Sequence, residues 1–120
     1  MNNIDLPDFK LSEFICPCCG ACEMDKEFLW KLQRCRSIAG IPFKITSGFR
    51  CKKHNKEVGG VEESEHLIGR AADIYVKNNH TRFLILNAAI YCTFHRIGIG
   101  SNMIHLGNSR EHPKEVVWLY

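Results

Sequence analysis

The 120-residue sequence predicts a small α+β domain, in which an antiparallel sheet is accompanied by a few helices. Two segments, residues 25–40 and 81–93, carry apolar side chains at helical spacing, whereas several short segments alternate apolar and polar residues. The length leaves room for one domain with a modest core. We therefore expect residues 1–120 to form a single domain, with residues 1–24 as an amino-terminal segment packed on the rest.

The first predicted helix begins near Asp25, a good N-cap, and ends near Gly40, a residue suited to a helix C-terminus. Its apolar face is expected to consist of Phe28, Leu29, Leu32, Cys35 and Ile38.

The rest of the chain is expected to add strands around a second helix. Residues 43–47 and 71–76 read as strands, and the polar, glycine-bearing stretch 48–65 between them reads as an irregular loop. The helix over residues 81–93 is expected to turn Phe83, Leu84, Leu86 and Ile90 inward. Shorter strands are expected within residues 96–100, 103–106 and 115–120.

The composition excludes several classes of protein. A net charge of +3 with interspersed signs is no nucleic-acid signature, and the apolar run at residues 83–92 is too short to span a bilayer. The first eight residues lack the basic start and apolar core of a signal peptide. We therefore expect no nucleic-acid partner, no membrane insertion and synthesis into the cytoplasm.

Seven cysteines are many for this length, and four of them lie within seven residues. The set Cys16, Cys18, Cys19, Cys22 and Cys51 offers enough sulfur for a structural zinc. The spacing is not that of a zinc ribbon with two separate Cys-x-x-Cys pairs. Buried free thiols or a disulfide are the alternatives.

His66, Asp73 and His105 form the residue set of a catalytic zinc site with an open fourth position. Their spacing is not that of a helical His-Glu-x-x-His motif. From the spacing alone, they could also be a loop histidine, a turn-forming aspartate and a core histidine.

The wider sequence resembles the zinc D-alanyl-D-alanine carboxypeptidase family, which includes phage endolysins and shares its fold with the Hedgehog signalling domain. The resemblance rests on Ser47-Gly-Phe-Arg50, on Ser64-x-His66 followed by Gly69-x-Ala-Ala-Asp73, and on Ile104-His105 and Val117-Trp118. It implies that His66, Asp73 and His105 bind Zn2+. It also implies that Arg50 holds the substrate carbonyl or oxyanion. Ser64 could contact substrate or cap its own turn.

One part of the family pattern is missing. Such enzymes carry an acid three residues before the last histidine ligand or two residues after it, and this chain has Asn102 and Gly107 there. Candidates for a replacement base are Glu65, His80, His95, Glu111 and His112.

The resemblance implies a zinc peptidase that hydrolyses D-Ala-containing bonds of peptidoglycan stem peptides as a carboxypeptidase or endolysin. We expect the protein to be a monomer. An endolysin would act on the cell wall after phage-type release. The missing acid favours an alternative, a catalytically inactive zinc-binding module that recognises wall peptide or a protein partner. A cysteine-dependent redox or metal-storage protein is a third class.

Overall fold

The computed structural model describes residues 5–120, so residues 1–4, part of the stretch on which the signal-peptide expectation rests, lie outside it. Five strands form one sheet in the order β1-β2-β4-β3-β5. Their bounds are β1 (Ile45–Ser47), β2 (Ala71–Tyr75), β3 (Arg96–Ile99), β4 (Met103–Gly107) and β5 (Val116–Leu119). With the helices described next, these strands confirm the α+β class.

The sheet differs from the expected antiparallel one at its last strand. β5 pairs with β3 in parallel, whereas the other neighbouring strands are antiparallel. β5 follows β4 and runs opposite to it, so when β5 pairs with the free edge of β3 it runs in the same direction as β3.

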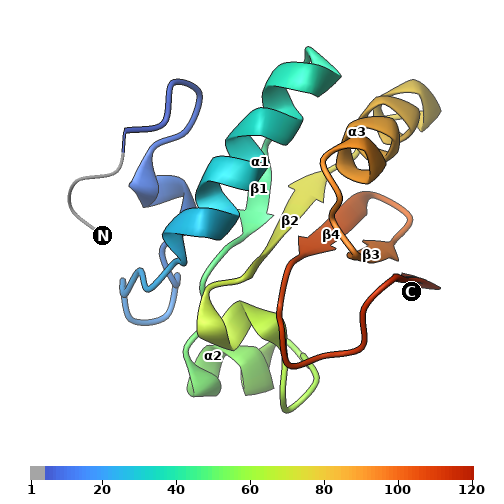
Figure 1. The fold of residues 1–120 in the computed structure, drawn as a ribbon. Helices are drawn as coiled ribbons and strands as arrows, with labels where there is room; N and C mark the ends of the chain where they lie inside the picture. Colours follow the sequence, from blue (N-terminus) through green and yellow to red (C-terminus); the bar gives the residue numbers. More distant parts are fainter. Residues whose placement is uncertain (1–4) are drawn as a thin grey trace.

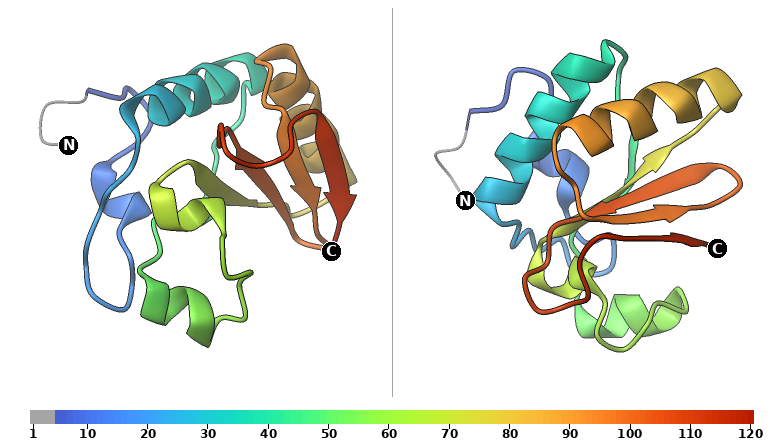
Figure 2. Two further views of the ribbon diagram at one scale, coloured as in Figure 1. Left: turned by 60° about the horizontal axis from the view of Figure 1, so that its bottom comes forward. Right: turned by 45° about the vertical axis from the view of Figure 1, so that its right-hand side comes forward.

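Two longer helices, α1 (Lys26–Ala39) and α3 (Asn79–Tyr91), lie side by side and cover one face of the sheet (Figures 1 and 2). A shorter helix, α2 (Lys52–Glu57), lies away from them at the end of the molecule drawn lowest in Figure 1. Two 3-10 turns, η1 (Leu11–Phe14) and η2 (Glu65–Ile68), complete the elements. Among the described residues, no helix has both the length and the apolar character needed to cross a membrane.

The predicted ends of α1 are confirmed. The Asp25 carboxylate accepts a hydrogen bond from the Phe28 amide at 2.8 Å, and Gly40 adopts a left-handed φ of 71°. Most of the predicted apolar face is buried, but Ile38, in the last turn of the helix, is exposed.

The predicted inner face of α3 is wrong at Phe83 and Ile90, whereas Leu86 packs against the core as predicted. Phe83 and Ile90 are more than 60% exposed, whereas Ile85, Ala88 and Ala89 are buried. Leu84 and Leu86 are half-buried. The small alanines allow α3 to pack closely against the structure beneath it, so the largest apolar side chains were a poor guide to its inner face.

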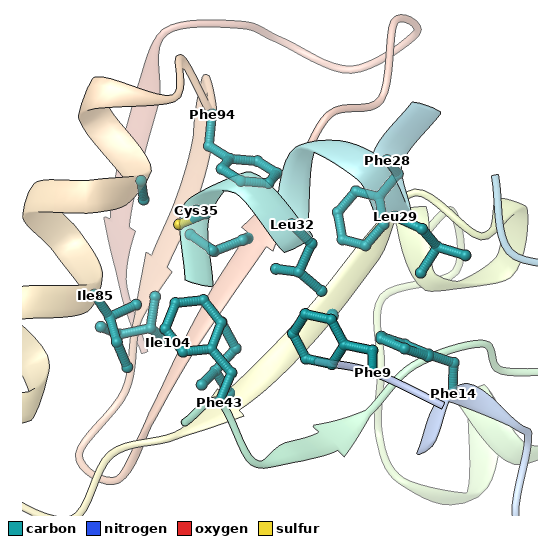
Figure 3. Close-up of a cluster of buried hydrophobic side chains, with 14 of the residues drawn as sticks. Phe9, Phe14, Phe28, Leu29, Leu32, Cys35, Phe43, Ile85, Phe94 and Ile104 are labelled. Carbon is teal, nitrogen blue, oxygen red and sulfur yellow. The ribbon is translucent and has the colours of Figure 1, made fainter. Parts of the chain in front are cut away.

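The hydrophobic core lies between the two long helices and the sheet, and includes the amino-terminal segment (Figure 3). Phe9 and Phe14 meet edge to face with ring centroids 5.6 Å apart, and Phe28 meets Phe94 in the same way. Strand side chains alternate between faces. Ile74 and Ile104 therefore join the core, whereas their neighbours Asp73 and His105 point to the opposite face.

The stretch expected to be an irregular loop contains α2 and ends at Glu65, the first residue of η2. Helix α2 is polar and only six residues long, so it carries no periodic apolar signal. The Cys51 sulfur caps it by accepting from the His54 amide at 3.4 Å.

Candidate metal centre

The three predicted metal ligands meet on the sheet face that the long helices leave uncovered. Asp73 on β2 and His105 on β4 are direct partners in the antiparallel ladder, and His66 enters from η2. All three residues are buried, and one ligand atom from each lies within 4.8 Å of the other two. The structure thus brings together side chains up to 39 positions apart.

The separations between these atoms suit a small divalent metal. Asp73 Oδ1 lies 3.2 Å from His66 Nε2 and 3.0 Å from His105 Nδ1. Zn–N and Zn–O bonds of about 2.0–2.1 Å place tetrahedral ligand atoms about 3.3 Å apart. The donor set therefore fits zinc with little rearrangement.

Hydrogen bonds on the far side of each ring select the ligand nitrogen. The Gly48 carbonyl, which can only accept, lies 2.7 Å from His66 Nδ1, so Nδ1 carries the proton and Nε2 faces the site. His105 has the opposite arrangement. Its Nε2 lies 2.6 Å from Glu65 Oε1, which leaves Nδ1 facing Asp73.

The electrostatics of the cluster favour a cation. Burial raises the pKa of Asp73, but the His105 and His66 imidazoles beside its carboxylate outweigh burial and hold this pKa well below the usual range. Burial lowers the pKa of His66. Burial also opposes charge on His105, yet the Asp73 and Glu65 carboxylates raise its pKa overall. The site therefore has a carboxylate that stays ionised and is surrounded by nitrogen donors.

Arg50 holds the other oxygen of the Asp73 carboxylate. Its Nη2 lies 3.2 Å from Asp73 Oδ2, while its Nε donates to Ser47 and its Nη1 to Asn55. These bonds fix the guanidinium and orient Asp73 so that Oδ1 faces the histidines. Arg50 also lines the cleft over the site.

The orientation of Glu65 was the hardest feature of the site to predict from the sequence. Residues adjacent to a ligand usually point away from it, yet the buried Glu65 side chain reaches His105 and also accepts from Arg96 Nε at 3.0 Å and the Ser109 amide at 3.1 Å. These donors offset the effect of burial and lower the pKa of Glu65. The turn of η2 makes this possible because it turns residues 65 and 66 toward the same sheet face.

The Glu65 carboxylate occupies the space beside Gly107. A Cβ atom added at Gly107 would lie 2.1 Å from Glu65 Oε1. Gly107 is one of the two positions where the resemblance led us to expect an acid. The Glu65 carboxylate thus fills the space that an acidic side chain at position 107 would need.

The cleft above the site has a volume of about 740 Å³. Ser64 lies in its wall, where its hydroxyl accepts from the His66 amide at 3.2 Å and so caps η2. Of the five candidate bases, only Glu65 and His112 line this cleft. His112 is bonded through Nδ1 to Ser109 Oγ at 2.6 Å. His80, His95 and Glu111 lie elsewhere.

Trp118, which lies in the strand expected within residues 115–120, forms another wall of the cleft. Its ring centroid lies 5.2 Å from that of His105, and the Arg96 guanidinium carbon lies over the Trp118 ring, 5.0 Å from the centroid. The indole covers Gly98, where a Cβ would lie 2.6 Å from Nε1. The pairing of Gly98 with Trp118 across β3 and β5 could not be read from either segment alone.

The fold and this cluster define a class of protein. Two imidazole nitrogens and one carboxylate oxygen at the base of an open cleft are the donor set of a hydrolytic metal site. Residues 7–107 match the family model described as Peptidase M15. The chain belongs to the peptidase M15 family.

A named relative is the zinc D-Ala-D-Ala carboxypeptidase of Streptomyces albus G. The two sequences are 43% identical over 47 residues, a segment that makes up 38% of this chain. That segment spans 18% of the relative, so the chain matches less than a fifth of that protein's length.

Proposed function

We propose that the protein is a zinc peptidase that hydrolyses D-Ala-containing peptide bonds of peptidoglycan stem peptides. The observation that carries the proposal is the convergence of His66 Nε2, Asp73 Oδ1 and His105 Nδ1 at the base of a cleft. When bound there, zinc supplies a Lewis acid that polarises the scissile carbonyl and lowers the pKa of water. The substrate class comes from the carboxypeptidase relative.

The residues around the ligands have separate tasks in this proposal. Arg50 uses three of its five N–H groups on Ser47, Asn55 and Asp73, which leaves two for a substrate carbonyl or oxyanion. Ser64 has its hydroxyl proton free to donate to a substrate amide carbonyl while it caps η2.

Glu65 is a positioning residue in this proposal. Its carboxylate is held by hydrogen bonds from other residues of the chain, namely His105, Arg96 and the Ser109 amide. A carboxylate held in this way fixes the ring of a ligating histidine and raises its basicity. The family pattern places an acid at position 107. In this chain the carboxylate of Glu65, which adjoins the proposed ligand His66, fills that space instead.

The hydrogen bonds that engage the Glu65 carboxylate also favour a second candidate function. Because Glu65 is fully engaged and position 102 is an asparagine, neither supplies a free base in the cleft. A zinc-binding module that recognises wall peptide without cleaving it would need no such base. The two candidates differ in turnover, not in metal binding.

The deciding experiment offers the zinc-loaded protein a synthetic peptide ending in Lys-D-Ala-D-Ala, beside the same peptide ending in L-Ala-L-Ala. Release of D-Ala from the first peptide only, abolished in His66→Ala and retained in His80→Ala, would support a carboxypeptidase. His80 is the matched control because it is exposed on α3, away from the cleft. Internal fragments from purified peptidoglycan would indicate an endolysin instead. Saturable peptide binding without any product would establish the binding module.

A further inference from the structure

A second cluster of metal-binding side chains lies outside the cleft. The sulfur atoms of Cys16, Cys19 and Cys51 all lie within 4.8 Å of one another, although Cys51 is 32 or more positions from the other two. Cys16 is buried, Cys51 is half-buried and Cys19 is exposed. The structure thus joins the amino-terminal cysteine group to the residue that directly follows Arg50.

The separation of the sulfur atoms is too long for a disulfide and is compatible with a shared metal ion. Cys16 Sγ and Cys51 Sγ are 3.7 Å apart. A disulfide would require about 2.05 Å between them. Two thiolates on a tetrahedral zinc, each about 2.3 Å from the metal, lie about 3.8 Å apart. The observed distance matches the second arrangement.

The backbone around Cys16 forms a tight turn that presents two sulfurs from one Cys-x-x-Cys segment. The Gly20 amide donates to the Cys16 carbonyl at 2.7 Å, and Gly20 has a left-handed φ of 75°, which favours glycine. Burial raises the pKa of the Cys16 thiol, but hydrogen bonds from the backbone of Cys51, Cys18 and Cys19 outweigh it and lower this pKa to about 7. Cys16 is thereby prepared to bind as a thiolate.

The other two cysteines of the predicted set differ in their positions. Cys22 points away, with its sulfur 3.8 Å from the Leu11 carbonyl. The exposed Cys18 thiol neighbours that of Cys51, but it lies outside the group of three sulfur atoms within 4.8 Å of one another. Cys18 can supply a fourth sulfur once its exposed side chain turns toward the group, whereas Cys22 is directed elsewhere.

We propose that Cys16, Cys19 and Cys51, with Cys18 at the fourth position, bind a structural zinc ion separate from the one at His66. Each thiol gives up its proton to solvent on binding, so the step involves no redox change. The irregular sequence spacing that argued against a zinc ribbon is explained by the fold, because Cys51 replaces the second Cys-x-x-Cys pair.

The site would fasten the amino-terminal segment to the loop that carries Arg50. That contact already includes a hydrogen bond from the Phe49 amide to the Phe14 carbonyl at 2.9 Å. A closed thiolate site contributes directly to folding free energy, which matters for a chain with a modest core. We therefore expect the cysteine site to stabilise the loop that carries Arg50, and with it the cleft.

The test measures metal content and cobalt spectra of the full chain, purified under reducing conditions. We expect two zinc ions in the native protein and one each in His66→Ala and in Cys19→Ala. After exchange with Co2+, sulfur-to-cobalt charge-transfer absorption should persist in His66→Ala and disappear in Cys19→Ala. Cys18→Ser should weaken this absorption without abolishing it.

Cys22→Ala is the matched control and should behave as the native protein. Cys19 is exposed whereas Cys16 is buried, so its replacement disturbs the core less. Circular dichroism of Cys19→Ala would verify that the variant folds. Absence of charge-transfer absorption in His66→Ala would overturn the proposal. So would a Cys16–Cys51 disulfide found by mass spectrometry in the protein purified under reducing conditions. Because His66→Ala removes the cleft site, these results do not depend on whether the protein is a peptidase.

Discussion

Glu65 Oε1 lies 2.6 Å from Nε2 of His105, a partner 40 positions later in the chain. The carboxylate is buried, and the same oxygen also accepts from Arg96. This contact fixes which nitrogen of His105 faces Asp73, so the geometry of one proposed ligand depends on the residue next to another. The contacts of Glu65 and of the other residues around the cleft lead to four predictions.

Replacing Glu65 with glutamine should weaken zinc binding at the cleft without unfolding the protein. The amide keeps the shape of the side chain but removes the charge that holds the His105 ring. Losses of about 10–100-fold in metal affinity are typical when such a partner is removed. Competition with a zinc chelator measures the change. Glu63→Gln, an exposed residue of the same cleft, is the control, and equal affinities for the two variants would contradict the positioning role.

A new acid at Gly107 should be tolerated only when Glu65 is removed. Gly107→Asp alone forces two carboxylates into one space, and we expect it to destabilise the fold by more than about 1 kcal/mol. Combined with Glu65→Ala, the new carboxylate can approach His105. Zinc affinity of the double variant should then exceed that of Glu65→Ala alone. Urea unfolding and chelator competition report the two quantities, and a double variant no better than Glu65→Ala would refute the exchange.

Arg50→Lys should reduce both zinc affinity and peptide hydrolysis. A lysine cannot bond Ser47, Asn55 and Asp73 together, so the Asp73 carboxylate loses its fixed orientation. We expect zinc affinity to fall about tenfold or more. Arg34→Lys, exposed on α1, serves as the control. If kcat/KM fell while zinc affinity stayed unchanged, Arg50 would act on the substrate alone.

Gly48→Ala should destabilise the fold by about 1–3 kcal/mol, the usual cost of overpacking. The added Cβ would lie 2.6 Å from the Phe14 Cα, a backbone atom that cannot move independently. Gly100→Ala is the matched control, because its nearest neighbour is the flexible Met103 side chain. Free energies of unfolding in urea give the comparison. Similar losses in the two variants would show that the contact between Gly48 and Phe14 has no special importance.

The sequence alone determined the helix over α1, with its caps at Asp25 and Gly40, because capping and apolar periodicity depend on residues a few positions apart. It also grouped His66, Asp73 and His105 through the family resemblance, and the structure places them together. The ligand roles themselves stay proposals until metal binding is measured.

Other features were decided only by the tertiary structure. The inner face of α3, the parallel pairing of β5, the approach of Glu65 to His105 and the meeting of Cys51 with Cys16 all depend on which elements become neighbours. Local periodicity shows which side chains share a face of a strand or helix. It does not show what that face packs against, because such contacts join residues distant in sequence and are fixed by the packing of the whole domain.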